Sequence, residues 1–388
     1  MTRLWDILKN KLQNENGIIS IGFSDIVGSG IASIFWLYIA SVIEPEAYGE
    51  IHYFLGIAGM AYVVSMIGNS HVLTVYSAKK EKIQSTLFLL SIIPSIISSI
   101  IIIIIFNRID SALLVFGYVI FESVNAVTLG RKYYRKYAKM ILIQKSLTIV
   151  LGISFFYLFG AVGIIFALAL TFIPHMIVFI KEFQKTKINF SLLLEKKGFI
   201  INNYFTTLSG SFGGQIDKII LAPLLGFTLL GNYSLSLQIF TILVIFSSIV
   251  FKFLLPQDSS GNNIKRIKKY TILVSVIISV FGVTIVPKLI PIFFVKFIET
   301  VDAISIMSLA VVPETITMLL TSKMLGQEKS RFILIAKLIS LVITIIGFIV
   351  LGPIYGIIGL AFVIVASSII QVIFLIITDR IIEDKRNV

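Results

Sequence analysis

The sequence contains no cysteine, few charged side chains and only three histidines. The absence of cysteine excludes disulfide bonds, thiolate metal sites and cysteine nucleophiles. Charged residues make up 14% of the 388 positions and hydrophobic residues 57%, against about 25% and about 45–50% in a soluble globular chain. This composition is a poor fit to a water-soluble enzyme, a disordered protein or a nucleic-acid-binding protein. It predicts an all-α integral membrane protein that is embedded in the lipid bilayer. We expect no nucleic-acid partner.

Long apolar runs, bounded by charges or by Gly and Pro turns, fill most of the chain. A helix that crosses a bilayer takes about 20 residues. The runs predict twelve spans with no soluble domain between them, at 17–41, 51–76, 85–106, 111–130, 140–159, 161–180, 199–224, 232–256, 270–287, 301–322, 332–352 and 355–378.

The segment 1–16 precedes the first run and has a different pattern. Leu4, Leu8 and Leu12 repeat at helical spacing beside Arg3 and Lys9, which predicts a short helix on the membrane surface. The segment has no apolar core of the kind that a cleavable signal peptide requires.

The basic residues are distributed unevenly between alternate loops. The loops on the side of the two termini hold most of the 33 Lys and Arg residues, whereas the opposite loops hold only Arg108, Lys288 and Lys296. Basic loops of membrane proteins stay in the cytoplasm. We therefore expect a multi-pass protein of the cytoplasmic membrane with both termini inside and the 42–50 loop outside.

The sequence also contains an internal duplication. Gly28-Ser29 and Gly49 recur 182 positions later as Gly210-Ser211 and Gly231, and the segment 159–169 recurs 196 positions later as 355–365. The larger second offset predicts extra residues near 287–302. We expect two parallel six-helix repeats, an N-lobe at 17–194 and a C-lobe at 195–388, an arrangement found in transporters that rock around a central site.

Three groups of motifs resemble a known family. They are Ile43–Gly49 with Ser65–Asn69, Asp217–Ala222 with Leu225–Ser234, and Pro353–Gly359. They are similar to the polysaccharide and O-antigen flippases of the multidrug/oligosaccharidyl-lipid/polysaccharide (MOP) exporter superfamily, which also includes lipid II flippases and the multidrug and toxin extrusion (MATE) antiporters.

The resemblance implies a MATE-like fold, a V-shaped pair of six-helix bundles, and a flippase that works by alternating access. Its substrate would be a polyprenyl-(pyro)phosphate-linked sugar, with polysaccharide-assembly proteins as further partners. The charged head of such a lipid cannot cross about 30 Å of hydrocarbon unaided. A flippase must therefore offer the head a polar, cationic groove.

The span at 199–224 is the most polar and is the predicted lining of that groove. Thr207, Ser211, Asp217 and Lys218 fall on neighbouring helical stripes, and Ser29 belongs to a similar face of the first span. We expect Lys218 to contact the anionic head group. The alternative is that the glycines of this span allow close helix packing and that a neighbouring helix satisfies Asp217 and Lys218.

Three carboxylates lie inside predicted spans and are candidates for ion coupling. Asp25 is eight residues, or about 12 Å, beyond Gly17, and it resembles the first-helix acid of some MATE proteins. Glu122 and Glu314 lie within the fourth and tenth spans. The coupling ion would be H⁺ or Na⁺, and the alternative for each residue is a structural hydrogen bond.

Three lysines lie just inside the predicted cytoplasmic boundary, namely Lys145, Lys252 and Lys337. Their long side chains reach the interface by snorkelling, which is the simpler interpretation. The other is a vestibule that attracts phosphate.

No phosphate-binding loop, metalloprotease motif or nucleophile elbow occurs in the sequence. We therefore expect a transporter rather than an enzyme, with no resident cofactor or metal. One competing function is an ion-coupled multidrug antiporter, which would favour aromatic residues and carboxylates. The other is a membrane-embedded acyl- or glycosyltransferase, and the scattered histidines argue against its catalytic pair.

Overall fold

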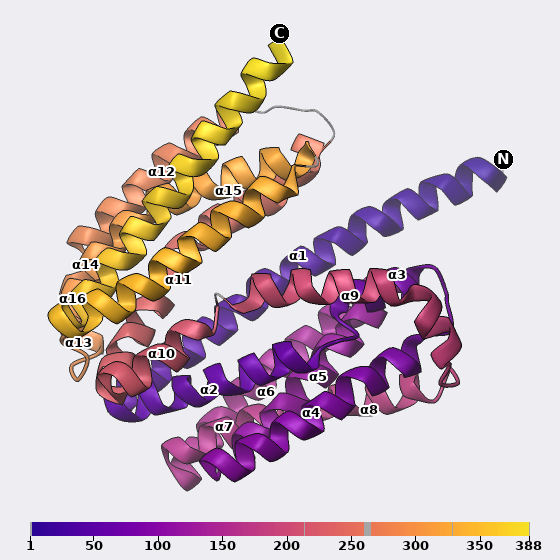
Figure 1. Ribbon diagram of the computed structural model, residues 1–388, viewed down its shortest axis with the longest axis horizontal. Helices are drawn as coiled ribbons and strands as arrows, with labels where there is room; N and C mark the ends of the chain where they lie inside the picture. The colour runs from indigo at the N-terminus through magenta and orange to yellow at the C-terminus, as the bar shows by residue number, and fades with distance from the viewer. Residues whose placement is uncertain (1, 213, 260–264, 328, 388) are drawn as a thin grey trace. The chain divides into compact units, whose positions relative to one another are not determined.

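The computed structural model describes residues 2–212, 214–259, 265–327 and 329–387 (Figure 1). Side chains are described for these residues except 2–20, 206, 209–212, 256, 259 and 383–387. Every regular element in this part of the chain is a helix, which confirms the predicted all-α class.

The chain forms two compact units. Unit 1 comprises residues 1–35 and 54–216, and unit 2 comprises residues 36–53 and 217–388. The units are defined by packing and the predicted lobes by the sequence repeat, so the lobe boundary at 194/195 stays a prediction. The first two helices, α1 (Thr2–Val42) and α2 (Pro45–Ser65), contribute to both units.

Unit 1 contains seven further helices. They are α3 (Ser70–Ala78), α4 (Gln84–Phe106), α5 (Ile109–Gly130), α6 (Tyr134–Phe159), α7 (Ala161–Leu170), α8 (Ile173–Phe183) and α9 (Phe190–Phe212). Unit 2 contains α10 (Ile216–Leu225), α11 (Phe227–Ser259), α12 (Lys265–Thr284), α13 (Val286–Phe293), α14 (Thr300–Met307), a 3₁₀ turn (Ser308–Ala310), α15 (Val311–Gly326) and α16 (Ser330–Asn387).

Helices cover the positions of the twelve predicted spans, and all but the one predicted at 199–224 are long and apolar enough to cross a membrane. Among the described residues, nine helical stretches are long and apolar enough to cross a membrane, and the bent pair α2 and α3 adds a tenth. The last stretch turns at Gly356 and supplies two of the predicted spans. The span predicted at 199–224 is divided between α9 and α10.

Three predicted boundaries are wrong. Residues 2–42 form one continuous helix, so the helix predicted at 1–16 does not end before the first span, and its position on the membrane surface stays a prediction. The expected 42–50 loop is reduced to Ile43-Glu44, because α2 already begins at Pro45. The last turn is at Gly356 rather than at 352–355.

The isoleucine-rich α4 shows why these segments are helical. In lipid, every backbone group must be hydrogen-bonded within the structure, so even β-branched residues adopt a helix. Large apolar side chains of α4 face outward, and Ile104 is 76% exposed. The helix ends at Asn107, whose left-handed backbone (φ 52°) donates its N–H to the Ile103 carbonyl. An outward apolar face of this kind is typical of contact with lipid.

The internal repeat is visible in the backbone. Gly160 joins α6 to α7 with φ 69° and ψ −159°, and Gly356, 196 positions later, turns α16 with φ 57° and ψ −139°. A Cβ at Gly163 would press on the Phe155 carbonyl, and one at Gly359 on the corresponding Leu351 carbonyl. The two hairpins are therefore built in the same way.

A second pair of bonds locates the extra residues of unit 2. The Ser99 hydroxyl donates to the Ala112 carbonyl at 3.0 Å, and the Ser279 hydroxyl donates to the Ser308 carbonyl at 2.8 Å. Only Asn107 and Arg108 separate α4 from α5, whereas α13 and the segment up to Thr300 separate α12 from α14. The extra residues thus lie where the growing offset predicts them.

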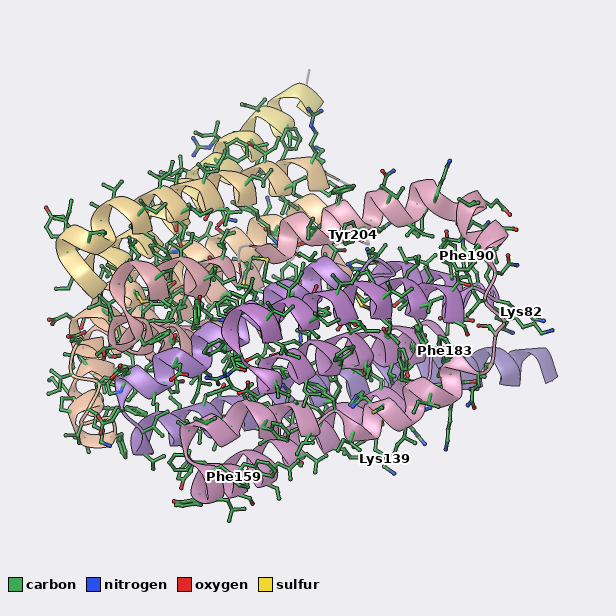
Figure 2. The ribbon with its side chains drawn as sticks, turned by 60° about the horizontal axis from the view of Figure 1, so that its bottom comes forward. Lys82, Lys139, Phe159, Phe183, Phe190 and Tyr204 are labelled. Carbon is green, nitrogen blue, oxygen red and sulfur yellow. The ribbon has the colours of Figure 1, made fainter. Side chains whose placement is uncertain are left out.

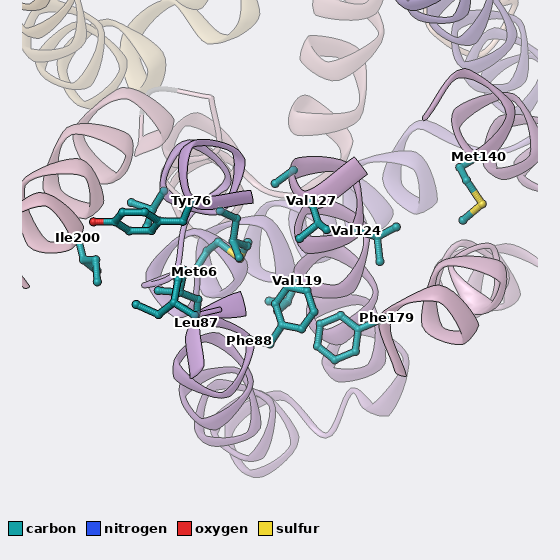
Figure 3. Close-up of a cluster of buried hydrophobic side chains, with 14 residues drawn as sticks. Met66, Tyr76, Leu87, Phe88, Val119, Val124, Val127, Met140, Phe179 and Ile200 are labelled. Carbon is teal, nitrogen blue, oxygen red and sulfur yellow. The ribbon is translucent and has the colours of Figure 1, made fainter. Parts of the chain in front are cut away.

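The core of unit 1 lies between α3, α4, α5 and α8 (Figure 3). Phe88 stacks on Phe179 with ring centroids 4.4 Å apart. Figure 3 shows Met66, Leu87 and Val119 converging on the same cluster. This packing fixes the helix ends that surround the polar sites described below.

In unit 2, two repeat-related glycines form a close helix crossing. A Cβ at Gly49 would collide with the Phe227 carbonyl, and a Cβ at Gly231 would collide with the Pro45 carbonyl. The contact is reciprocal, because each glycine lies four residues after the residue that the other approaches. Only glycine allows two backbones to come this close.

Candidate functional site

A carboxylate and a tyrosine meet between α1 and α6 in unit 1. The Tyr137 hydroxyl donates to Asp25 Oδ1 at 3.3 Å. One turn further along, Ile141 and the aliphatic stem of Lys145 pack against Gly28, within 3.3 Å of where a Cβ would stand. The glycine lets α6 approach α1 closely enough for Tyr137 to reach Asp25.

Glu122 of α5 lies near the same tyrosine. Ser70 and His71 of α3 are close enough to its carboxylate to interact with it electrostatically. Tyr137 in turn interacts electrostatically with both Asp25 and Glu122. Of the three predicted coupling residues, Asp25 is therefore hydrogen-bonded to Tyr137, and Glu122 lies within electrostatic range of the same hydroxyl group.

Unit 2 contains a second pair of this type. The Tyr233 hydroxyl of α11 donates to Asp217 Oδ2 at 3.3 Å, while Asp217 Oδ1 accepts the Lys218 backbone N–H at 2.9 Å. Tyr233 is fully buried and lies edge-on to Phe348, with ring centroids 5.6 Å apart. Asp217 thus stands at the start of α10, where the helix dipole favours a negative charge.

Lys218 is half-buried, next to an aromatic cluster of unit 2. It interacts electrostatically with Asp217 and with His52 of α2. His52 packs against Trp36 and Tyr48, with ring centroids 4.8 Å and 4.5 Å away. Neither imidazole nitrogen of His52 has a hydrogen-bond partner among the described residues. The site therefore offers a cation beside buried groups that can form hydrogen bonds.

The third predicted coupling residue lies within electrostatic range of a predicted vestibule residue. Glu314 of α15 is half-buried and interacts electrostatically with Lys337 of α16. The side chain of Lys337 is exposed, as is that of Lys252 on α11, whereas Lys145 is half-buried. The choice between snorkelling and a phosphate-attracting vestibule stays a prediction for all three lysines.

The other predicted lining residues belong to unit 1 rather than to the unit that contains Lys218. Ser29 is exposed on α1, and the Thr207 hydroxyl is buried in α9 without a hydrogen-bond partner in the described part of the chain. Ser211 lies outside the described side chains. Both Ser29 and Thr207 belong to unit 1, whereas Asp217 and Lys218 belong to unit 2. The shared groove that these residues would line stays a prediction.

Sequence reasoning missed Tyr137, Tyr233 and His52. Tyr137 has a usable signal, because it shares a helical stripe with Ile141 and Lys145 at spacings of four. Tyr233 stands inside the Gly231–Ser234 motif, but nothing local indicates its bond to Asp217. No group of His, Asp and Glu suited to a metal ion occurs among the residues described.

The fold is shared with solved transporter structures. A MATE-family multidrug resistance transporter of the MOP superfamily, in an inward-facing conformation, matches with a TM-score of 0.69 and 14% identity, over 95% of this chain and 98% of that one. The lipid II flippase MurJ, inward closed, matches with a TM-score of 0.71 and 14% identity, over 93% and 87%.

A third match is a MOP-superfamily transporter from Pyrococcus furiosus, whose binding pocket is described as having reversed polarity. The TM-score is 0.62 and the identity 16%, over 94% of this chain and 95% of that one. No family model and no characterised protein sequence matches the chain. The chain is a polytopic all-α membrane protein with the two-repeat MOP-superfamily fold, as the sequence motifs predict.

Proposed function

We propose that this protein is a flippase that moves a lipid-linked oligosaccharide or polysaccharide repeat unit across the cytoplasmic membrane by alternating access. The observation that carries the proposal is the likeness to the lipid II flippase MurJ over 93% of the chain. The basic-loop pattern supports an orientation with both termini in the cytoplasm. Polysaccharide-assembly proteins would then act on the product at the outer face.

The chemistry of unit 2 supports an anionic substrate head. Lys218 is a half-buried cation whose neighbour His52 leaves both ring nitrogens available. A pyrophosphate that leaves water needs charge-assisted hydrogen bonds to offset its desolvation. Lys218 would contact the phosphate, and Asp217, held by Tyr233, would orient the start of α10.

The chemistry of unit 1 supports coupling to an ion. Asp25 and Glu122 both interact electrostatically with Tyr137, so a proton or Na⁺ held by one carboxylate would change the field at this tyrosine. An ion shifts a conformational equilibrium only by its differential affinity for the two states. The affinity for the ion would differ between the two states if this site opened to water in only one of them.

A test of the substrate is flipping of a fluorescent polyprenyl-pyrophosphate oligosaccharide in proteoliposomes. Lys218→Ala should slow flipping by about tenfold or more, the loss of one strong charge-assisted bond, whereas Lys218→Arg should retain part of the activity. Lys288→Ala is the matched control, because Lys288 is exposed and the substitution removes the same charge. Unchanged flipping by Lys218→Ala would remove this lysine from the mechanism.

The second candidate is an ion-coupled multidrug antiporter. The carboxylate and tyrosine cluster of unit 1 favours it, since carboxylates and aromatic rings suit cationic drugs. Efflux of a cationic dye from the same proteoliposomes under a pH or sodium gradient tests this function. Dye efflux that Asp25→Asn abolishes, together with no flipping of the lipid-linked sugar, would favour the antiporter.

A further inference from the structure

A cavity of about 550 Å³ opens at the end of unit 1 that is predicted to be cytoplasmic. Three helix connections surround it, namely those between α3 and α4, between α5 and α6, and between α8 and α9. Figure 2 shows Lys82 at this end, together with Phe183 and Phe190, which flank the third connection. None of the residues proposed above to bind substrate or ions lines the cavity.

Basic side chains dominate the lining. Five of its residues are cations and one, Glu81, is an acid; the cations are Lys80, Lys82, Arg131, Lys132 and Lys185. Arg131 and Lys185 are held by the buried Glu182 carboxylate at 2.5 Å and 2.7 Å, and Glu81 lies 3.7 Å from Lys196. Lys80, Lys82 and Lys132 make no ion pair within the described ranges.

Two buried polar groups of the lining also lack partners. Ser77 is 2% exposed and Gln84 is 4% exposed. The Ser77 hydroxyl and Gln84 Oε1 have no hydrogen-bond partner among the described residues. Buried polar atoms are nearly always hydrogen-bonded, so a pair left open in one cavity points to a ligand or bound water.

The backbone presents two of the lysines at a conformational cost. Lys80 and Lys132 have φ of 57° and 60°, in the left-handed region that favours glycine. Each follows the end of its helix in the same capping arrangement: the Lys80 N–H donates to the Ser77 carbonyl, and the Lys132 N–H donates to the Leu129 carbonyl. Lysine at both such positions indicates that the charge itself is needed there.

The general tendency of cytoplasmic loops to be basic does not explain the cations of this cavity. In the repeat of α5, Leu129-Gly130-Arg131-Lys132 corresponds to Leu325-Gly326-Gln327-Glu328, so the cations are absent from the second copy. In unit 2, Lys268 is bound to Asp258 and Lys323 is bound to Asp379, both at 2.7 Å. The cavity of unit 1 therefore gathers cations that the second copy of the sequence does not repeat.

We propose that this cavity binds a phosphate-bearing anionic ligand, either the head group of an anionic lipid of the adjacent leaflet or a free pyrophosphate. Lys80, Lys82 and Lys132 would neutralise the phosphate oxygens, and the Ser77 hydroxyl would donate a hydrogen bond to one of them. Arg131 and Lys185 stay bound to Glu182 and complete the positive wall. The lining does not include Lys218, and the site acts whichever substrate the protein carries.

The test is ligand binding by the full-length protein, measured by native mass spectrometry from a neutral detergent. One arm titrates phosphatidylglycerol against phosphatidylcholine, and the other titrates inorganic pyrophosphate. We expect the double variant Lys80→Gly/Lys132→Gly to bind the preferred ligand with an affinity lower by about tenfold or more. Glycine adopts the left-handed backbone of both positions more readily than lysine does, so the melting temperature should not fall.

Lys265→Gln/Lys269→Gln is the matched control, since it removes two exposed cations of unit 2 and should leave binding unchanged. Lys82→Gln/Lys132→Gln is a second variant that leaves the backbone at Lys80 untouched. Selective loss of phosphatidylglycerol binding assigns the site to a lipid head group, and selective loss of pyrophosphate binding assigns it to a soluble anion. Binding of both probes at wild-type strength by both cavity variants would overturn the proposal, whether or not the protein flips a lipid.

Discussion

The two units share a hairpin but differ at the opposite helix ends. Gly160 and Gly356 have nearly the same backbone angles, and Gly163 and Gly359 press on corresponding carbonyls. At the other end of the same helices, Arg131-Lys132 in unit 1 stands where Gln327-Glu328 stands in unit 2. The comparison indicates that duplication preserved the positions that backbone geometry dictates and left the charges free to diverge.

The largest effect should come from the glycine crossing. Gly231→Leu places a side chain against the Pro45 carbonyl, which cannot move without displacing α2. We expect a loss of more than about 3 kcal/mol in the free energy of unfolding, or failure to fold. Thermal denaturation in detergent measures it, and Gly49→Leu should behave alike. Gly30→Leu is the control, because nothing lies within 4 Å of a Cβ there. Comparable melting of all three variants would contradict the reciprocal contact.

The next effect separates the charged ends of the two units. Glu182 is buried, with its side chain 7% exposed, and holds both Arg131 and Lys185. Glu182→Gln should cost about 2–3 kcal/mol, because two cations lose their partner. Asp379 is 15% exposed and holds Lys323, so Asp379→Asn should cost about 1 kcal/mol or less. Equal losses in the melting temperature would show that the two ends do not differ in the way the structure indicates.

A smaller and equal effect should follow at the shared hairpin. Gly160→Ala and Gly356→Ala each force alanine into a region that only glycine adopts readily, at a cost of about 1–3 kcal/mol. The two losses should agree within about 0.5 kcal/mol, since separate sites of the same geometry act independently. A large effect at one glycine and none at the other would break the equivalence of the repeats.

The smallest effect concerns the left-handed lysines. Lys80→Gly and Lys132→Gly relieve backbone strain but add flexibility to the unfolded chain, so we expect a gain of about 0.5 kcal/mol each. Lys79→Gly provides the contrast, because Lys79 has φ −74° and gains nothing from glycine. It should lose about 0.5–1 kcal/mol. Destabilisation by all three variants would mean that the Lys80 and Lys132 side chains contribute more to packing than their geometry indicates.

Much of the fold could be predicted from the sequence because lipid imposes a simple rule. Each apolar run must be helical, so α4, α5 and the turn at Gly160 follow directly from hydropathy and glycine. The junction at residue 17 could not be predicted, because a change in polarity does not by itself break the hydrogen bonds of α1. The bend between α2 and α3 depends on Asn69, whose side chain caps α3 by accepting the Val72 N–H.

The candidate site was less predictable. Polar side chains inside the spans are conspicuous, so Asp25, Glu122 and Asp217 could be chosen from the sequence. Their partners depend on which helices pack together, and Tyr137 lies 112 positions from Asp25. The basic cavity of unit 1 combines three connections that are far apart in the chain, and the left-handed backbone of two of its lysines has no sequence signature.

The assignment of residues 36–53 to unit 2 has a consequence for any attempt to split the protein. A fragment that begins at Asp217 lacks residues 36–53, whose Gly49 packs against Phe227. The surface of α11 that this segment covers would therefore be exposed in the isolated fragment. The complementary fragment ending at Ile216 would contain residues 36–53 without the α11 backbone against which they pack. Two such pieces should be unstable alone and recover only when co-expressed, so the duplicated halves have become obligate complements rather than autonomous modules.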